Sequence, residues 1–327
     1  MKTAYFWLTP QGKQLAEQLQ AHFGGMVEPK ADFAEAVRRA FADCDALVFV
    51  MATGIVVRTI APLVQSKASD PAVLVLDQRG KHVISLLSGH LGGANAMAEQ
   101  AAAYLGGEAV ITTATDVEHV PAFDLFAKEN HLTIENLEEL KYISGALVAG
   151  EPVSLCTAFP VEKNAFPETV QIQPFSETPR HACAVAIADT TESVAAPHVL
   201  YLRPKSLVLG EQCFRTFLQE HHLSLSAVEK LATIGLKREE PAILALCEKY
   251  RLPLEIVADA DIQACAYPFA ASAFVQQVTG LPSVSEASAY LASGCGKVLT
   301  GKVKYSGVTF AACRKTIEPL HWKERGQ

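Results

Sequence analysis

The segment Ser88–Asn95 places three glycines, a histidine and an asparagine between an apolar run and an alanine-rich helical pattern. A helix that begins after such a turn has unpaired N–H groups at its start, together with the positive end of its dipole. Because glycines let a ligand approach the backbone closely, the pattern indicates a turn that binds phosphate or carboxylate. A tight packing turn, with Asn95 in the first helical turn, explains the same glycines.

His90 is the histidine inside this turn. The pKa of an imidazole lies near neutrality, so His90 is a candidate general acid, general base or hydrogen-bond donor. A histidine that only stabilises the turn is the alternative. The candidate binding residues of the turn are Ser88, Gly89, Gly92, Gly93 and Asn95.

Two more polar groups follow predicted strands. Thr53 and Gly54 come after the apolar run 46–51, and Thr113, Thr115 and Asp116 come after the run 108–111. Ligands of open α/β sheets bind beyond the carboxyl ends of the strands. We therefore expect both groups to meet the Ser88–Asn95 turn at one edge of a sheet.

Two charged residues of these groups have a chemical and a structural interpretation. Asp116 either orients a catalytic base or caps the start of the segment before Pro121. Arg58, one turn into the helix after Gly54, either binds a carboxylate or is a solvated residue on a helix face. The sequence leaves both choices open.

A second candidate anion-contact patch lies near the end of the chain, where Lys302, Lys304 and Ser306 surround a predicted turn at Gly307. A solvated hairpin is the alternative. Separately, Lys237 ends a predicted strand before a helix and is a further candidate binding residue. Motifs of the types G-x-G-x-x-G, P-loop, G-x-S-x-G and H-E-x-x-H are absent from the sequence, so dinucleotide binding, P-loop phosphate binding, serine hydrolysis and zinc peptidase activity find no support.

The composition excludes further classes of protein. Half of the 327 residues are apolar, 19% are charged, and the net charge is −7, which argues against nucleic acid as a partner. The eight cysteines contain no C-x-x-C pair, so we expect reduced thiols and no bound metal. The sequence has no signal-peptide pattern and no apolar run of membrane-spanning length, which predicts a cytoplasmic protein without a membrane partner.

Strands and helices alternate along most of the chain, which predicts an α/β fold. We expect an N-terminal α/β domain with a mainly parallel sheet over residues 1–132, whose one antiparallel departure is a hairpin at 78–81. A small, strand-rich middle connector covers 133–204 and a C-terminal α/β domain covers 205–327. The apolar spacing also predicts one long helix over 132–153 and a helix over 224–231.

The residues in these positions resemble a known family. The stretch 48–116, "VFVMATGIVVRTIAPLVQSKASDPAVLVLDQRGKHVISLLSGHLGGANAMAEQAAAYLGGEAVITTATD", is similar to the N-terminal part of the cobalt-precorrin 5A hydrolase family of anaerobic cobalamin biosynthesis. Three later stretches are also similar to that family: "TIGLKREEPAILALCEKYRLPLEI", "LPSVSEASAYLASG" and "KVKYSGVTFAAC". The resemblance covers nearly the whole chain.

The resemblance implies a reaction: hydrolytic opening of the ring A δ-lactone of cobalt-precorrin 5A, giving cobalt-precorrin 5B and acetaldehyde. Cobalt then arrives inside the corrinoid substrate, and the protein needs no cofactor of its own. Neighbouring enzymes of the pathway are candidate partners. We hypothesise that His90 activates water or protonates the leaving oxygen, that the Gly92 and Gly93 amides stabilise the oxyanion, and that Arg58 and Lys302 hold carboxylates of the substrate.

One segment departs from the family pattern. Relatives have a turn of the type G-x-G-C-R-R-G, whereas this chain has "LVLGEQCFRTFL", which keeps Gly210, Cys213 and Arg215. The altered turn favours a second hypothesis, a non-catalytic carrier of corrinoid intermediates. A third is a sugar-phosphate or nucleotide enzyme that uses the Ser88–Asn95 turn, although the chain lacks a phosphate-loop lysine.

Overall fold

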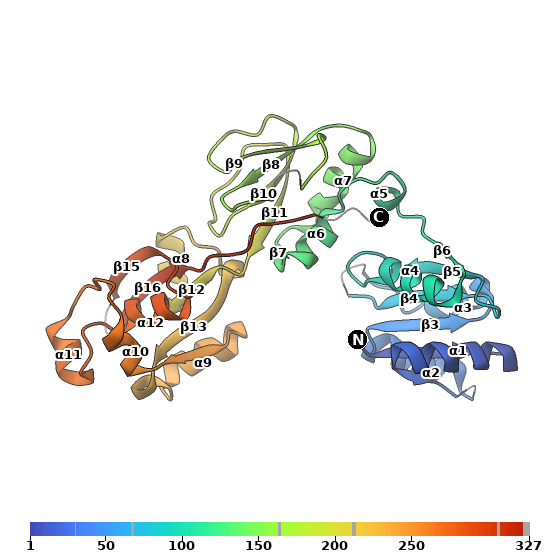
Figure 1. Ribbon diagram of the computed structural model, residues 1–327, viewed down its shortest axis with the longest axis horizontal. Helices are drawn as coiled ribbons and strands as arrows, with labels where there is room; N and C mark the ends of the chain where they lie inside the picture. The colour runs from blue at the N-terminus through green and yellow to red at the C-terminus, as the bar shows by residue number, and fades with distance from the viewer. Residues whose placement is uncertain (30, 67–68, 163–164, 211–213, 306–307, 323–327) are drawn as a thin grey trace. The chain divides into compact units, whose positions relative to one another are not determined.

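The computed structural model describes residues 1–29, 31–66, 69–162, 165–210, 214–305 and 308–322 (Figure 1). These residues divide into two compact units, 1–125 and 126–322. One β-sheet belongs to the first unit and two belong to the second. The predicted α/β class is confirmed, whereas the domain boundaries at residues 132 and 204 stay a prediction. Within the described ranges, every helix is too short or too polar to span a membrane.

The sheet of the first unit has the strand order β2-β1-β3-β4-β5-β6. The strands are β1 (Thr3–Trp7), β2 (Met26–Val27), β3 (Ala46–Val50), β4 (Ala72–Leu76), β5 (His82–Leu87) and β6 (Glu108–Val110). Strands β2, β1, β3 and β4 are parallel to one another, β5 is antiparallel to β4, and β6 is parallel to β5. The predicted hairpin between β4 and β5 is therefore confirmed.

Helices α1 (Pro10–Phe23) and α4 (Ala94–Leu105) cover one face of this sheet, and α2 (Phe33–Asp43) and α3 (Thr53–Ile60) cover the other. Two short helices follow β6, α5 (Ala114–Val117) and α6 (Phe123–Glu129). Side chains alternate between the faces of a strand. In β1, Tyr5 accordingly belongs to the core under α1 and α4, and Phe6 belongs to the core under α2 and α3.

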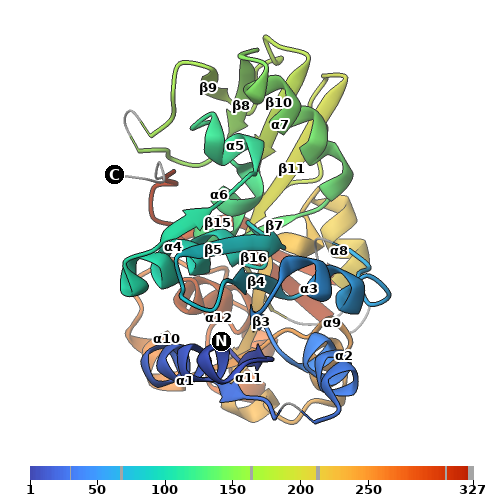
Figure 2. The ribbon, with the colours of Figure 1, turned by 90° about the vertical axis from the view of Figure 1, so that its right-hand side faces the viewer.

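The second unit begins with a sheet of order β7-β11-β10-β8-β9 (Figure 2). Its elements are β7 (Leu132–Ile134), the 3₁₀ helix η1 (Leu137–Glu139), α7 (Leu140–Val148), β8 (Val153–Thr157), β9 (Val170–Pro174), β10 (Cys183–Ile187) and β11 (His198–Pro204). The expected long helix over 132–153 is wrong. Asn136 interrupts it, because its side chain pairs with the backbone of Val199 and Tyr201 in β11 and draws β7 into the sheet.

The second sheet of this unit has the order β14-β13-β12-β16-β15. Its elements are β12 (Leu207–Gly210), α8 (Phe214–Glu220), η2 (Leu225–Ala227), β13 (Val228–Ile234), η3 (Gly235–Lys237), α9 (Pro241–Tyr250), β14 (Leu254–Val257), α10 (Asp259–Ala264), α11 (Ala273–Thr279), α12 (Ser285–Ala292), β15 (Lys297–Tyr305) and β16 (Val308–Arg314). The expected helix over 224–231 is wrong, because Val228 begins a strand that pairs with β12 and β14. In the altered turn, Gly210 ends β12 and Arg215 lies in α8, whereas Cys213 lies outside the described residues.

Candidate active site

The direction of the strands decides which predicted site residues meet. In the hairpin, Leu87 at the end of β5 pairs with Val73 near the start of β4, whereas Val50 at the end of β3 pairs with Leu76 at the end of β4. The ends of β5 and β6 therefore lie at the opposite edge of the sheet from the end of β3. The expectation that all three strand ends meet at one edge is wrong, because the hairpin reverses the chain direction.

Thr53, Gly54 and Arg58 consequently lie away from His90. Thr53 lines a cavity of about 580 Å³ beyond the ends of β1 and β3, together with Thr9 and Gln78. The exposed Arg58 guanidinium donates from Nη1 to the Gly54 carbonyl oxygen at 2.9 Å, within its own helix. A role for these three residues in substrate binding stays a prediction.

The Ser88–Asn95 turn contains the packing features that its glycines predict. A Cβ on Gly92 would lie 2.5 Å from Ser88 Cβ, and Gly93 has a φ of +90°. The N–H groups of Ala94 and Asn95 donate to the carbonyls of Ser88 and Gly89 at 3.1 and 3.0 Å. Packing therefore explains why Gly92 and Gly93 are glycines. Hydrogen bonds to the Ser88 and Gly89 carbonyls pair two of the first N–H groups of α4.

The N–H groups of Gly92 and Gly93 are different. Neither donates to a described residue, and both glycines are only partly buried. Two adjacent backbone donors next to a helix N-terminus have the chemistry of an oxyanion site.

Asn95 connects the turn to the end of β6. Its side chain is 1% exposed, and its Oδ1 accepts a hydrogen bond from Ser85 Oγ at 2.6 Å. Its Nδ2 donates to Thr113 Oγ1 at 3.2 Å and to Asp116 Oδ2 at 2.9 Å. Asn95 therefore fixes the position of Asp116 relative to the turn.

His90 lies between two carboxylates. Its Nε2 is 2.7 Å from Asp116 Oδ2, and its Nδ1 is 3.1 Å from Asp124 Oδ1. Thr115 Oγ1 is 3.5 Å from the same Nε2. The three charged side chains are only 9–13% exposed. The imidazolium form satisfies this geometry, because both ring nitrogens then donate to an acceptor.

Burial and charge act in opposite directions on the pKa of His90. Burial lowers the pKa, because it disfavours the charged ring, but hydrogen bonds and charges of Asp116 and Asp124 raise it by more. The resulting pKa is about 9, raised from 6.5. His90 is therefore a protonated group at neutral pH, and in this state it is an acid and not a base.

Of the two interpretations of Asp116, the geometry favours orientation. The residue that precedes α5 is Thr113, and Asp116 lies inside the helix with its side chain directed to His90. Sequence reasoning missed Asp124. The available signal was a lone carboxylate in the apolar run Ala122–Phe126, which predicts a buried charge with a partner.

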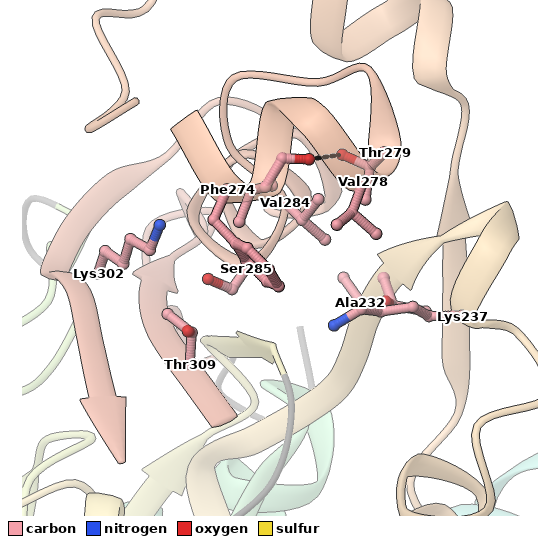
Figure 3. A pocket seen from close by; sticks show the side chains of 11 residues that line it. Ala232, Lys237, Phe274, Val278, Thr279, Val284, Ser285, Lys302 and Thr309 are labelled. Atoms are coloured by element: carbon pink, nitrogen blue, oxygen red, sulfur yellow. Dashed lines mark hydrogen bonds between the residues drawn. The ribbon is translucent and has the colours of Figure 1, made fainter. Parts of the chain in front are cut away.

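Lys237 and Lys302 line the same pocket in the second unit. The volume of this pocket is about 110 Å³, and Ser285 and Thr309 also line it (Figure 3). Ser306 lies outside the described residues. In the part of the chain that the structure describes, no group of three or more His, Cys, Asp or Glu side chains is arranged to hold a metal ion.

Comparison with known proteins identifies the family. Its Cobalamin synthesis G N-terminal profile matches residues 35–116, the Cobalamin biosynthesis central region profile matches 121–204, and the Cobalamin synthesis G C-terminus profile matches 203–313. The cobalt-precorrin-5A hydrolase of Salmonella typhimurium is 33% identical, over 94% of this chain and 95% of that protein. The cobalt-precorrin-5A hydrolase of Priestia megaterium is 32% identical, over 83% of this chain and 79% of that protein.

Among solved structures, a cobalamin biosynthesis protein G homologue from Sulfolobus solfataricus is similar, with 21% identity, a TM-score of 0.41, and coverage of 96% of this chain and 97% of that chain. The sequence relationships to the curated hydrolases extend over all three segments of the chain. The chain therefore belongs to the cobalt-precorrin-5A hydrolase family of enzymes in cobalamin biosynthesis.

Proposed function

We propose that this chain hydrolyses the ring A δ-lactone of cobalt-precorrin 5A and releases cobalt-precorrin 5B and acetaldehyde. The observation that carries the proposal is the environment of His90. This residue of the glycine turn is held as an imidazolium between Asp116 and Asp124. The names of the curated relatives support the same substrate.

In this proposal His90 acts as the general acid. Attack of water on the lactone carbonyl breaks the acyl C–O bond and gives a carboxylic acid and an alcohol. The alcohol then loses its O–H proton to solvent, and the C–C bond between the two-carbon unit and the macrocycle breaks, which releases acetaldehyde and leaves the electron pair on the macrocycle. In the first of these steps the leaving oxygen needs a proton. His90 carries one at neutral pH, and its Nε2–H is shared with Asp116 at 2.7 Å. Asp124 holds the ring through Nδ1, so that a proton transfer from Nε2 leaves the ring in one tautomer.

The turn supplies the second part of the mechanism. The carbonyl oxygen becomes negatively charged when water adds to the lactone, and backbone donors stabilise that charge most when they are fixed in advance. Gly92 and Gly93 lie two and three residues after His90, with N–H groups that have no acceptor among the described residues. We assign the oxyanion to these two donors.

Cobalt belongs to the substrate, and the enzyme uses no resident cofactor. We place the reaction in the cytoplasm, with the neighbouring enzymes of the pathway as its candidate partners.

The experiment is incubation of the purified chain with cobalt-precorrin 5A. Acetaldehyde is measured with an NADH-coupled alcohol dehydrogenase, and the corrinoid product is identified by mass. We expect release of acetaldehyde together with the corrinoid product, and His90→Ala to lower the rate by about a hundredfold to ten-thousandfold while substrate binding is retained. Tight binding of cobalt-precorrin 5A without acetaldehyde would contradict hydrolysis and leave the carrier hypothesis. Unchanged turnover of His90→Ala would contradict the assigned role.

A further inference from the structure

The pocket that contains Lys237 and Lys302 is lined by residues of β13, η3, α11, α12, β15 and β16. Lys237 ends η3, directly after β13, and Lys302 lies in β15. Ser285 begins α12, and Thr309 lies in β16. Figure 3 shows the two lysines entering from opposite sides, with Ser285 and Thr309 between them. Two cations and two hydroxyls from separate elements thus face one small space.

The electrostatics of this space favour an anion. Burial lowers the pKa of Lys302, and the positive charge of Lys304 lowers it further, whereas Glu286 raises it. None of the ion pairs among the described residues includes Lys302, and the carboxylate that raises its pKa is Glu286. Glu286 does not line the pocket, and its Oε2 accepts from the Ala270 N–H at 3.4 Å. A bound anion would offset the cost of keeping the Lys302 ammonium away from water.

The start of α12 adds to this field. The residue before the helix is Val284, which has no side-chain acceptor to cap the first N–H groups. The positive end of the helix dipole therefore lies at Ser285, which lines the pocket, and the Glu286 carboxylate in the same first turn offsets part of it.

The size and the walls of the pocket limit the ligand. Its volume of about 110 Å³ is well below the roughly 300–1,000 Å³ of pockets that enclose a whole ligand. Phe274 and Val278 form part of the wall, yet they are 74% and 59% exposed. The pocket therefore fits one charged arm of a larger molecule, whose apolar body rests on the exposed side chains of α11.

We propose that this pocket binds one carboxylate side chain of the corrinoid, with Lys237 and Lys302 as its two cations and Phe274 and Val278 in contact with the macrocycle. This assignment rests on the proposed function, because that function supplies the corrinoid.

The test uses a probe that cannot be hydrolysed. Cobyrinic acid, a corrinoid with free carboxylates and no lactone, is titrated into the full chain by calorimetry, and its heptamethyl ester is the uncharged comparison. We expect Lys237→Met and Lys302→Met each to weaken binding of the acid by about tenfold or more. We expect the ester to bind weakly to the wild-type chain and to each variant. Lys297→Met is the matched control, because Lys297 is an exposed residue of the same strand and does not line the pocket.

The outcomes separate this inference from the proposed function. Absence of cobyrinic acid binding, or equal weakening by Lys297→Met, would overturn the pocket assignment, even where the wild-type chain releases acetaldehyde from cobalt-precorrin 5A. Lysine-dependent binding in a chain that releases no acetaldehyde would support the pocket and contradict the hydrolase. Displacement of the acid by an equal concentration of inorganic phosphate would also overturn the assignment, because it would indicate a general anion site. Circular dichroism establishes that each variant is folded.

Discussion

At the scale of single residues, the protonation state of His90 depends on its two carboxylates. Asp116 and Asp124 raise its pKa to about 9, against the opposing effect of burial. An acid must be protonated to act, so activity that depends on His90 is present below this pKa and is lost as the pH rises through it. A base with the same pKa would show the opposite dependence.

We expect Asp124→Asn to shift the alkaline limb of the pH–rate profile to lower pH, because the variant removes one of the two charges that stabilise the imidazolium. NMR titration of the His90 ring measures the same change in pKa independently of activity. Glu118→Gln is the control, since Glu118 is an exposed neighbour of Asp116 without a contact to His90 among the described residues. An alkaline limb that stays in place while the His90 pKa falls would show that another group sets the profile.

The sequence was sufficient to predict that His90, Asn95 and Asp116 lie close together, because they follow predicted strands in a glycine-rich context. It was insufficient for Asp124, which lies 34 residues from His90. Only the fold shows that the first turn of α6 lies against the glycine turn. The raised pKa also could not be predicted, because it depends on two distances that no sequence pattern encodes.

At the scale of elements, the hairpin between β4 and β5 has the largest consequence for the site. The residues Gln78–Lys81 predicted the hairpin correctly, and the structure confirms it. The rule that ligands bind at the carboxyl ends of strands holds for strands that run in the same direction. Strands β5 and β6 run opposite to β3 and β4. With the hairpin, the ends of β5 and β6 belong to one edge and the end of β3 to the other.

The tight approach of Gly92 to Ser88 leads to a stability prediction. We expect Gly92→Ala to lower the free energy of unfolding of residues 1–125 by about 1–3 kcal/mol, because its Cβ would lie 2.8 Å from the Ser88 carbonyl oxygen. Gly54→Ala is the matched control: its Cβ would meet only the flexible end of Arg58, at 3.3 Å. Denaturant unfolding followed by Trp7 fluorescence in a Trp322→Phe background measures both. Equal stability of the two variants would show that the turn relaxes to accommodate a side chain.

At the scale of the whole molecule, a buried polar network joins the two sheets of the second unit. Asp189, which is fully buried, pairs with Arg314 at the end of β16 and accepts a hydrogen bond from Ser206 Oγ at 2.9 Å. Glu135 pairs with Arg203 at 2.9 Å and accepts from Ser224 Oγ at 2.7 Å. Asp189 follows β10 of the middle sheet and Arg314 ends β16 of the last sheet, so this pair fixes the two sheets against each other. Glu135 and Arg203 both belong to the middle sheet's part of the chain, and Ser224, which precedes η2, connects Glu135 to the segment that leads into β13.

The Asp189–Arg314 pair contributes to the stability of the second unit. Removing one partner of a buried ion pair leaves the other charge without compensation, which costs about 3–5 kcal/mol. We expect Asp189→Asn to lower the free energy of unfolding of residues 126–322 by about 3 kcal/mol, since the Arg314 side chain is 21% exposed and water replaces part of the lost contact. Trp322, which stacks on Phe166 at 6.1 Å, reports this transition in a Trp7→Phe background.

Arg180→Gln, in an exposed pair with Glu177 at 3.9 Å, is the control and is expected to change stability by less than about 1 kcal/mol. Similar losses in both variants would mean that the Asp189 network contributes no more than a surface pair, and that apolar contacts alone hold the two sheets together.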